Sequence, residues 1–273
     1  MRLFTLATIA MLGAILHPTS AQLSAEEIAA GAVTRTFLEQ AELIDAEKMP
    51  ASEGVTEPMK LELSDGSTTA FALWKNPQGR LNGFLEGWKY EIAADRIDDY
   101  LGLNMVPPTI MRRYKGSQGS AQIWVDAWID MDQMIQKQID PTGSAVRSFN
   151  RAVYLQRAFD NLIANEDRHL RNILLTEDWR MILIDHSRSF RSSKKHQKRL
   201  IFTEKHREGP KLMKQLPREF VAKIEALDRA TLDELVGEWL TEPEILAILA
   251  RRELILTEIE RLVAANGEAA TLY

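Results

Sequence analysis

The sequence contains no cysteine, and this absence sets the first limit on what the protein can do. It excludes disulfide bonds, thiolate nucleophiles, iron–sulfur clusters and zinc sites built on thiolates. Strong basic charge is also missing, because 34 lysines and arginines are outnumbered by 39 aspartates and glutamates. With a formal net charge of -5 the chain as a whole does not attract nucleic acid, so we expect no nucleic-acid partner and place any cationic site locally.

Long apolar runs are equally scarce, and the prominent one lies at the N-terminus. Residues 1–21 begin with Arg2, continue with an apolar run over 3–16 and end in small residues, a pattern typical of a secretory signal peptide. The run is shorter than the ~20 residues that cross a bilayer, so we expect no transmembrane segment after cleavage. The sequence therefore predicts an exported protein, periplasmic or secreted, whose mature chain starts at Gln22.

Hydrophobic periodicity divides the rest of the chain into three parts. Residues 22–58 contain a helical pattern over 24–46 and then a polar connector. Residues 59–140 are rich in strand patterns, and residues 141–273 are mainly helical. This order predicts an α+β fold.

Turn and cap signals place the individual elements. Asp65-Gly66 joins two strand patterns, and Gly102 ends a helical pattern. The predicted elements are strands at 59–64 and 68–74, a loop at 76–83, a helix at 84–101, strands at 109–113 and 122–128, a helix at 147–164, a small hairpin at 173–175 and 181–184, and a helix at 241–265 that opens with a capping box.

The chemically informative window runs from Asn161 to Phe190. Within it Asp167 precedes Asn172, and two short apolar strands then lead to Asp185. Phosphoryl transfer needs such oxygen ligands around nucleotide phosphates. The spacing resembles that of protein kinases, in which the Asp orients the acceptor hydroxyl while the Asn and a later Asp hold Mg²⁺. Each residue alone is equally consistent with a turn or strand-end residue, so the ordered combination carries the hypothesis.

The run D-R-H-L-R-N at 167–172, followed by I-D-H-S at 184–187, resembles the signatures of the phosphatidylinositol 3-/4-kinase branch of the kinase-like superfamily. It also resembles HipA-like kinases and the secretory-pathway (Golgi) kinases. The resemblance extends upstream and covers about residues 59–190 in family order. It implies a bilobal protein-kinase-like fold, with a small β-rich N-lobe over 59–140 that carries one key helix and a mainly helical C-lobe over 141–273.

The resemblance also implies roles for single residues. Lys75 would contact the α- and β-phosphates of ATP, and Glu91 would pair with Lys75, although spacing leaves Glu86 as a rival. Asp167 would be the catalytic base. The metal, Mg²⁺ or Mn²⁺, would be bound by Asn172 and Asp185.

Three further positions are candidates around this centre. His169 would either form a structural hydrogen bond or touch the transferred phosphate. Trp124 and Val125 lie in the segment that would take the adenine, where Trp124 is either a packing residue or a purine contact. Because a G-x-G-x-x-G loop is absent, the backbone of 65–68 would have to cradle the phosphates.

A basic segment follows the predicted metal ligand. From Arg188 to Arg207 it holds eight lysines and arginines against the single acid Glu204. A charge run is usually a solvated face, but here it favours docking of an anionic acceptor. The leading hypothesis is an exported, ATP- and metal-dependent phosphotransferase acting on a hydroxyl of a protein, glycan or lipid headgroup. Two alternatives remain: a catalytically inactive kinase-like protein that binds a nucleotide or a partner, and an unrelated helical binding protein in which the acidic residues lie far apart.

Overall fold

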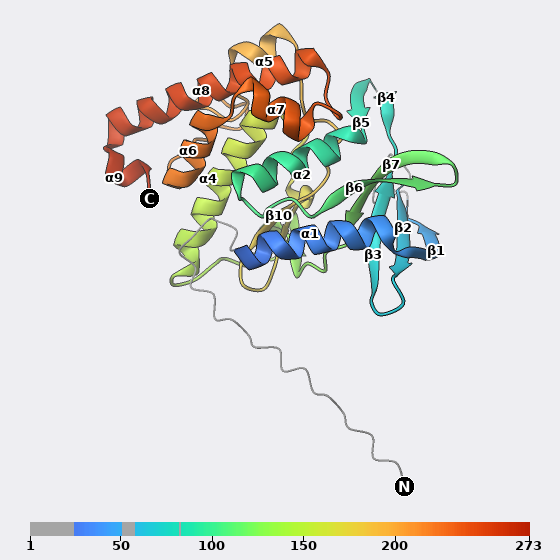
Figure 1. Cartoon of the computed structure of the whole chain (residues 1–273). Helices are drawn as coiled ribbons and strands as arrows, with labels where there is room; N and C mark the ends of the chain where they lie inside the picture. The colour runs from blue at the N-terminus through green and yellow to red at the C-terminus, as the bar shows by residue number, and fades with distance from the viewer. Residues whose placement is uncertain (1–24, 51–57, 82) are drawn as a thin grey trace.

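The computed structural model describes residues 25–50, 58–81 and 83–273 and shows an α+β protein, which confirms the predicted class. A five-stranded sheet lies at one end and most helices gather at the other, with helix α2 (Lys89–Leu101) between them (Figure 1). The predicted signal peptide and the start of the first predicted helix lie outside the described residues. No helix in the described ranges is long and apolar enough to cross a membrane.

The large sheet is antiparallel throughout and positions the first candidate residue, Lys75, at a strand end. Its strand order is β1-β2-β3-β7-β6, with β1 at Glu42–Lys48, β2 at Met59–Ser64, β3 at Thr69–Lys75, β6 at Thr109–Tyr114 and β7 at Ser117–Ile123. The predicted β2–β3 hairpin is confirmed. Its turn is closed by Asp65, whose Oδ1 accepts hydrogen bonds from the main-chain N–H groups of Ser67 and Thr68, each at 2.8 Å.

Three predicted boundaries differ from the structure. Helix α1 spans Ala25–Gln40 rather than reaching Ala46, because the chain then adds β1 to the edge of β2, where main-chain pairing replaces the helical turn. Strands β4 (Gln78–Leu81) and β5 (Phe84–Gly87) pair antiparallel where a loop and the first turns of a helix were predicted. Strand β7 starts at Ser117 and ends at Ile123, five residues before the predicted strand end.

The helical part follows the predicted order more closely. Helix α2 ends where Gly102 adopts φ 70°, and the N-terminus of α8 carries the predicted capping box. Between the helices lies a small sheet of order β10-β9-β8. The remaining elements are β8 Ile129–Asp130, α3 Met131–Gln136, α4 Ala145–Ile163, a 3-10 helix Leu170–Asn172, β9 Ile173–Leu175, β10 Met181–Leu183, α5 Lys194–Lys198, α6 Arg218–Ala226, α7 Arg229–Val236, α8 Glu242–Asn266 and α9 Glu268–Thr271.

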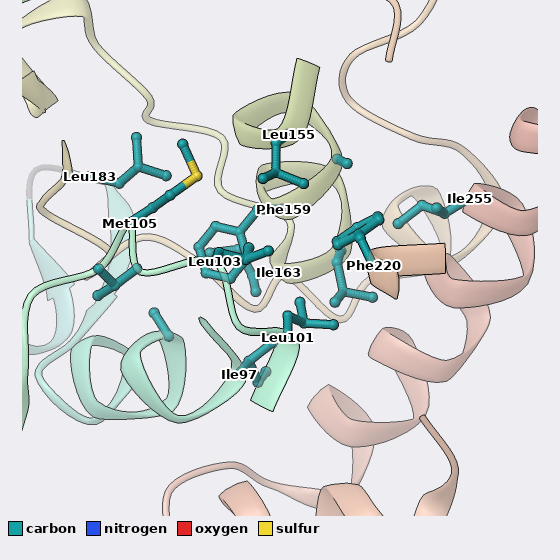
Figure 2. Packing of buried hydrophobic residues seen from close by; sticks show 14 of the residues in the cluster. Ile97, Leu101, Leu103, Met105, Leu155, Phe159, Ile163, Leu183, Phe220 and Ile255 are labelled. Carbon is teal, nitrogen blue, oxygen red and sulfur yellow. The ribbon is translucent and has the colours of Figure 1, made fainter. Parts of the chain in front are cut away.

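Two separate apolar cores hold these parts. The smaller one packs Leu38 of α1 against the sheet. The larger one contains the helical region and also takes up one face of α2, so that Ile97 and Leu101 pack with Phe159 and Phe220 (Figure 2). Helix α2 therefore lies between two strands in the sequence but is packed into the core of the helical region.

Helix α1 is joined to the rest of the protein by two arginines. Arg35 of α1 forms ion pairs with Asp95 of α2 at 2.7 Å and with Asp99 at 2.9 Å. Arg112 of β6 donates a hydrogen bond to the carbonyl of Ala41 at 2.6 Å, just beyond the end of α1. Residues 25–48 are therefore an integral layer of the sheet region, and α1 restrains the position of α2.

Candidate active site

Lys75, at the end of β3, is the centre of a buried cluster of charges. Its ammonium contacts Oε1 of Glu91 on α2. It also lies 2.7 Å from Oδ1 of Asp185, a residue that follows β10. The Glu91 side chain is only 1% exposed and that of Lys75 10%. Spacing had left Glu91 and Glu86 as alternatives, and the structure brings Glu91 to Lys75. Glu86 lies instead against Arg188, at 2.8 Å.

The three charges of this cluster stabilise one another. Burial opposes the charge on Lys75, but the carboxylates of Asp185 and Glu91 outweigh it and raise the pKa of the ammonium above its ordinary value. Burial alone would raise the pKa of both carboxyl groups. The positive charge of Lys75 outweighs this effect of burial. Hydrogen bonds from Lys75 to Asp185 and from His186 to Glu91 act in the same direction, so the pKa of both carboxyl groups is lowered instead. All three groups are therefore charged at neutral pH.

Asp185 combines a constrained backbone with a free carboxylate oxygen. Its φ of 59° lies in the left-handed region, which Asp tolerates better than most residues and which is costly enough to be common at functional sites. Oδ1 accepts hydrogen bonds from Lys75 and from the Ser187 hydroxyl at 3.2 Å, whereas Oδ2 has no partner within the described chain. The side chain is 41% exposed, so Oδ2 is open to a ligand.

The segments that carry the predicted metal ligands are held together by their main chains. The Ile184 N–H donates to the Asn172 carbonyl at 3.1 Å, which holds the chain just before Asp185 against the end of the 3-10 helix. In the described ranges no group of three or more His, Cys, Asp or Glu side chains is placed to hold a metal ion. One carboxylate and one carboxamide nevertheless fit Mg²⁺, which takes one or two protein ligands and fills its other positions with phosphate oxygens and water.

Asp167 lies on the loop that follows α4. The loop begins where Ala164 adopts φ 51°, and the Asp167 N–H donates to Asn165 Oδ1 at 3.0 Å. Both carboxylate oxygens of Asp167 are engaged: Oδ1 contacts His169 Nε2 and Oδ2 contacts Arg188 Nη1, each at 2.9 Å. His169, which is 63% exposed, therefore contacts the predicted base directly.

Sequence reasoning missed the buried arginine that holds this loop. Arg168 forms an ion pair with Asp160 of α4, with side-chain exposures of 2% and 0%. It also donates to the carbonyl of Ile184 at 2.6 Å and to that of Asn172 at 3.1 Å. One side chain thus ties together the loop and both predicted metal-ligand segments. A charged Asp160 on the apolar face of a predicted helix was the signal available in the sequence.

His186 extends this network to Glu91. Arg168 can only donate, so it donates to His186 Nε2 at 2.9 Å, and the proton of a neutral ring must lie on Nδ1, facing Glu91 Oε2 at 3.5 Å. Burial lowers the pKa of His186, and the neighbouring arginine acts in the same direction although Glu91 opposes both. The main-chain N–H of His186 also donates a hydrogen bond to Glu91 Oε2 at 2.9 Å. These contacts fix the orientation of Glu91 toward Lys75.

A cavity of about 470 Å³ adjoins the Lys75 end of β3. Leu73 from β3, Leu174 from β9 and Ile184 contribute apolar walls, and the chain from 122 to 130 forms the edge. Trp124 and Val125, the two candidates for adenine contacts, both line it. The Lys60 ammonium lies 4.4 Å from the Trp124 ring centroid, so this ring also has a packing partner. The turn at 65–68 does not line the cavity.

The basic segment 188–207 is not uniformly free. Arg188 is occupied by Glu86 and Asp167, and Arg191 contacts Glu166 at 3.4 Å. Other cations of the segment have no carboxylate partner in the described part of the chain, and Lys194, Lys198, Arg199 and Lys205 belong to this set.

The structure therefore brings Lys75, Glu91 and Asp185 into contact, places Asn172 and Asp167 beside them on linked segments, and puts Trp124 and Val125 in the adjoining cavity wall. A scan against protein-family models found no match, and a search of curated proteins found no matching relative.

Proposed function

We propose that the protein is an ATP- and metal-dependent phosphotransferase with a bilobal, kinase-like architecture, in which the sheet region is the N-lobe and the helical region the C-lobe. The observation that carries this proposal is the contact of the Lys75 ammonium with both Glu91 and Asp185. Three separate segments converge there beside a cavity. An unrelated helical protein has no reason to bury three charges together at such a point.

The 470 Å³ cavity suits the adenosine part of a nucleotide. Apolar side chains such as Leu73 and Ile184 would pack against a planar base, and the main chain at 125–127, which belongs to no helix or strand, offers polar groups at its edge. Lys75 then lies where the phosphates leave the cavity. Because Glu91 holds the ammonium in place, its charge can be directed at phosphate oxygens with little loss of side-chain entropy.

Asn172 and Asp185 would hold Mg²⁺ or Mn²⁺ between their side chains and the phosphates. The metal, when bound, neutralises charge on the phosphate oxygens. In the protein without ligand, Lys75 provides the counter-charge for Asp185 Oδ1, while Oδ2 remains accessible. Ser187 restrains the carboxylate further, so that its free oxygen keeps one direction.

Asp167 would orient the acceptor hydroxyl and accept its proton. Arg188 must then release Oδ2, because a carboxylate oxygen that receives a guanidinium N–H is a weaker proton acceptor. Glu86 is the second partner of Arg188, and it can keep the arginine near the centre after that release. The cation would then face the oxygens of the transferred group.

The same contact favours a second candidate function. With Arg188 and His169 on both oxygens, Asp167 is blocked as a base in this conformation. A catalytically inactive kinase-like protein that binds nucleotide would retain such a contact permanently. Metal-dependent ATP binding without transfer to any acceptor is the behaviour expected of it.

Calorimetric titration of the protein with ATP, in Mg²⁺ and in Mn²⁺, tests the proposal. We expect saturable binding that Asp185→Asn weakens by at least an order of magnitude, because the metal ligand and the Lys75 partner are lost together. Asp140→Asn, at an exposed aspartate that does not line the cavity, is the matched control and should bind like the wild type. Absence of nucleotide binding with either metal would refute the proposal.

Mass analysis after incubation with ATP separates the two candidate functions. A gain of one phosphate on the protein, or on an acidic protein, glycan or lipid added as acceptor, supports the phosphotransferase. Binding without any transfer supports the inactive alternative. The predicted export of the protein places the relevant acceptors in the periplasm or outside the cell, so these acceptors should be tested first.

A further inference from the structure

A second cavity, of about 710 Å³, lies beyond the loop that carries Asp167. Asn165 and Arg168 of that loop line one side, the chain from 195 to 211 lines another, and Glu258 and Arg261 of α8 complete the wall. Its volume is in the range of small-molecule sites. It shares no lining residue with the 470 Å³ cavity, so it is distinct from the proposed nucleotide cavity.

The wall of this cavity is constrained by α4. The Asn161 side chain accepts a hydrogen bond from the Phe202 N–H at 2.8 Å and donates one to the Phe202 carbonyl at 3.1 Å. The Phe202 ring stacks on His206, with centroids 5.3 Å apart and planes 18° from parallel. These contacts fix the middle of a segment that has little regular secondary structure. The cavity is thus a built feature rather than a gap under a loose loop.

Cations outnumber acids on the wall. The cations are Arg168, Lys195, Arg199, Lys205, Arg207, Lys211 and Arg261, and the acids are Glu166, Glu204, Glu208 and Glu258. Every one of these acids already contacts at least one cation. Arg199 and Lys205 have no carboxylate partner anywhere in the described ranges. A protein with net charge -5 therefore gathers an excess of positive charge around one hollow.

Asn165 provides a second, independent observation at this cavity. The residue is 1% exposed, and its Nδ2 group is buried without a hydrogen-bond partner in the described structure. Its Oδ1 accepts a hydrogen bond from the Asp167 N–H at 3.0 Å, which fixes the amide orientation and leaves Nδ2 as the group without an acceptor. A buried donor without an acceptor costs about 1–3 kcal/mol, so an acceptor atom supplied by a ligand would stabilise it.

We propose that this cavity binds a small molecule carrying at least two phosphate groups. Phosphate oxygens accept hydrogen bonds and never donate them when ionised, which matches Asn165 Nδ2 and the two unpaired cations. Arg199 can bind one phosphate through its planar fork, while Lys205 acts as a point charge on another. A cavity of this size excludes a nucleic-acid duplex. The proposal uses neither Lys75 nor Asp185 and stands apart from the proposed function.

Such phosphates have two sources, a free polyol phosphate or a lipid headgroup. Titrations with pyrophosphate and inositol hexakisphosphate measure the free form. Co-sedimentation with phosphatidylcholine vesicles, with and without a phosphoinositide, measures the lipid form. Binding of the soluble phosphates with no vesicle binding assigns a free ligand. Vesicle binding that inositol hexakisphosphate displaces assigns a headgroup.

A pair of matched double variants tests the site itself. Arg199→Gln with Lys205→Gln removes the two unpaired cations of the wall and should raise the Kd for inositol hexakisphosphate at least tenfold. Lys194→Gln with Lys198→Gln removes the same charge from the same segment at positions that do not line the cavity, and should change the Kd less than twofold. Circular dichroism of each variant verifies that the fold is retained.

Two single variants complete the test. Asn165→Asp keeps the acceptor for the Asp167 N–H but replaces the N–H donors of Asn165 with a carboxylate oxygen. It should therefore weaken phosphate binding more than the Lys194→Gln, Lys198→Gln control does. Asp185→Asn should leave phosphate binding unchanged while it weakens ATP binding by at least an order of magnitude. Equal weakening by the two double variants, loss of binding in Asp185→Asn, or no binding of any phosphate probe at low salt would overturn the proposal.

Discussion

Two charged regions flank Asp167, and they differ in how their charges are partnered. On the inner side Lys75, Glu91 and Asp185 form a closed set in which each charge has a counter-charge. On the outer side the chain from 194 to 207 carries several cations without a carboxylate. The inner charges are mostly buried and the outer ones mostly exposed.

Burial explains why the two regions obey different rules. An unpaired buried charge costs several kcal/mol, so the inner cluster can form only if its charges pair. An exposed cation is solvated and has no such requirement. The inner charges must therefore pair for the protein to fold, whether or not they take part in catalysis. Unpaired charge on the outer side contributes nothing to folding, which makes it the more direct indication of a binding partner.

The largest effect is expected from Asp167, between the two regions. Asp167→Asn keeps the shape of the side chain but cannot accept a proton, so transfer should fall by roughly 10²–10⁴-fold, the usual contribution of a general base. ATP binding should be nearly unchanged, because the inner cluster is intact. Single-turnover transfer and calorimetry measure the two quantities separately. Equal loss of both would show that Asp167 belongs to the inner cluster.

The next effect concerns stability. Arg168→Met leaves the Asp160 carboxylate buried without its counter-charge and should lower the free energy of unfolding by about 3–5 kcal/mol. The double variant Arg168→Met with Asp160→Leu removes both charges and should recover much of that loss. Urea denaturation of the wild type, the single variant and the double variant measures these free energies of unfolding. A double variant no more stable than the single one would mean that the hydrogen bonds to 172 and 184 matter more than the ion pair.

Salt distinguishes the two regions directly. The Debye length falls from about 10 Å at 0.1 M to about 3 Å at 1 M, so binding of inositol hexakisphosphate to exposed cations should weaken by roughly tenfold or more over that range. ATP binding should weaken less, because Lys75 is 8% exposed and held by Glu91. Titrations at several salt concentrations give both slopes. If the affinities for inositol hexakisphosphate and for ATP fell equally with salt, the two regions would not differ in how exposed their charges are.

The smallest effect is expected at Asp98 of α2, a buried carboxyl group that departs from the rule that buried charges are paired. Asp98 is 2% exposed and has no ion pair in the described structure. Burial, together with nearby Asp95, raises the pKa of Asp98 well above its ordinary value. The folded protein therefore favours the protonated form, and stability from this group is lost as pH rises through the folded pKa. Asp98→Asn should stabilise the protein by about 1 kcal/mol at pH 8, with the gain vanishing near pH 4. Thermal unfolding at both pH values measures it.

The sequence was most informative where local chemistry determines structure. Asp65-Gly66 specified a hairpin through its own side-chain hydrogen bonds, and the capping box at Thr241 specified the start of α8. It was least informative where tertiary pairing decides. Residues 42–48 contain helix-forming residues, but an available sheet edge makes them a strand. The β4–β5 hairpin was missed for another reason: the sequence does contain the strong turn signal Asn82-Gly83, but the short runs on either side of it were predicted as a loop and the start of a helix.

The candidate site shows the same division. Asp167, Asn172 and Asp185 stood out because they lie close together in a short ordered motif. The choice between Glu91 and Glu86 depended on where α2 begins, and a helix predicted from residue 84 could not resolve it. The position of Arg188 on Asp167 required the β4–β5 hairpin, whose Glu86 holds the arginine from about a hundred residues away in sequence.

The attachment of α1 to α2 through Arg35 bears on where this chain can be divided. The motif-bearing part starts near residue 59, which suggests a fragment beginning there as a minimal unit for expression or fusion. Such a fragment would expose the edge of β2, uncover the smaller apolar core and leave Asp95 buried with Arg96 but without Arg35. Insertions and tags are better tolerated at the exposed turn between β6 and β7, near Gly116. The smallest independent unit of this protein therefore begins upstream of its recognisable motifs, at α1.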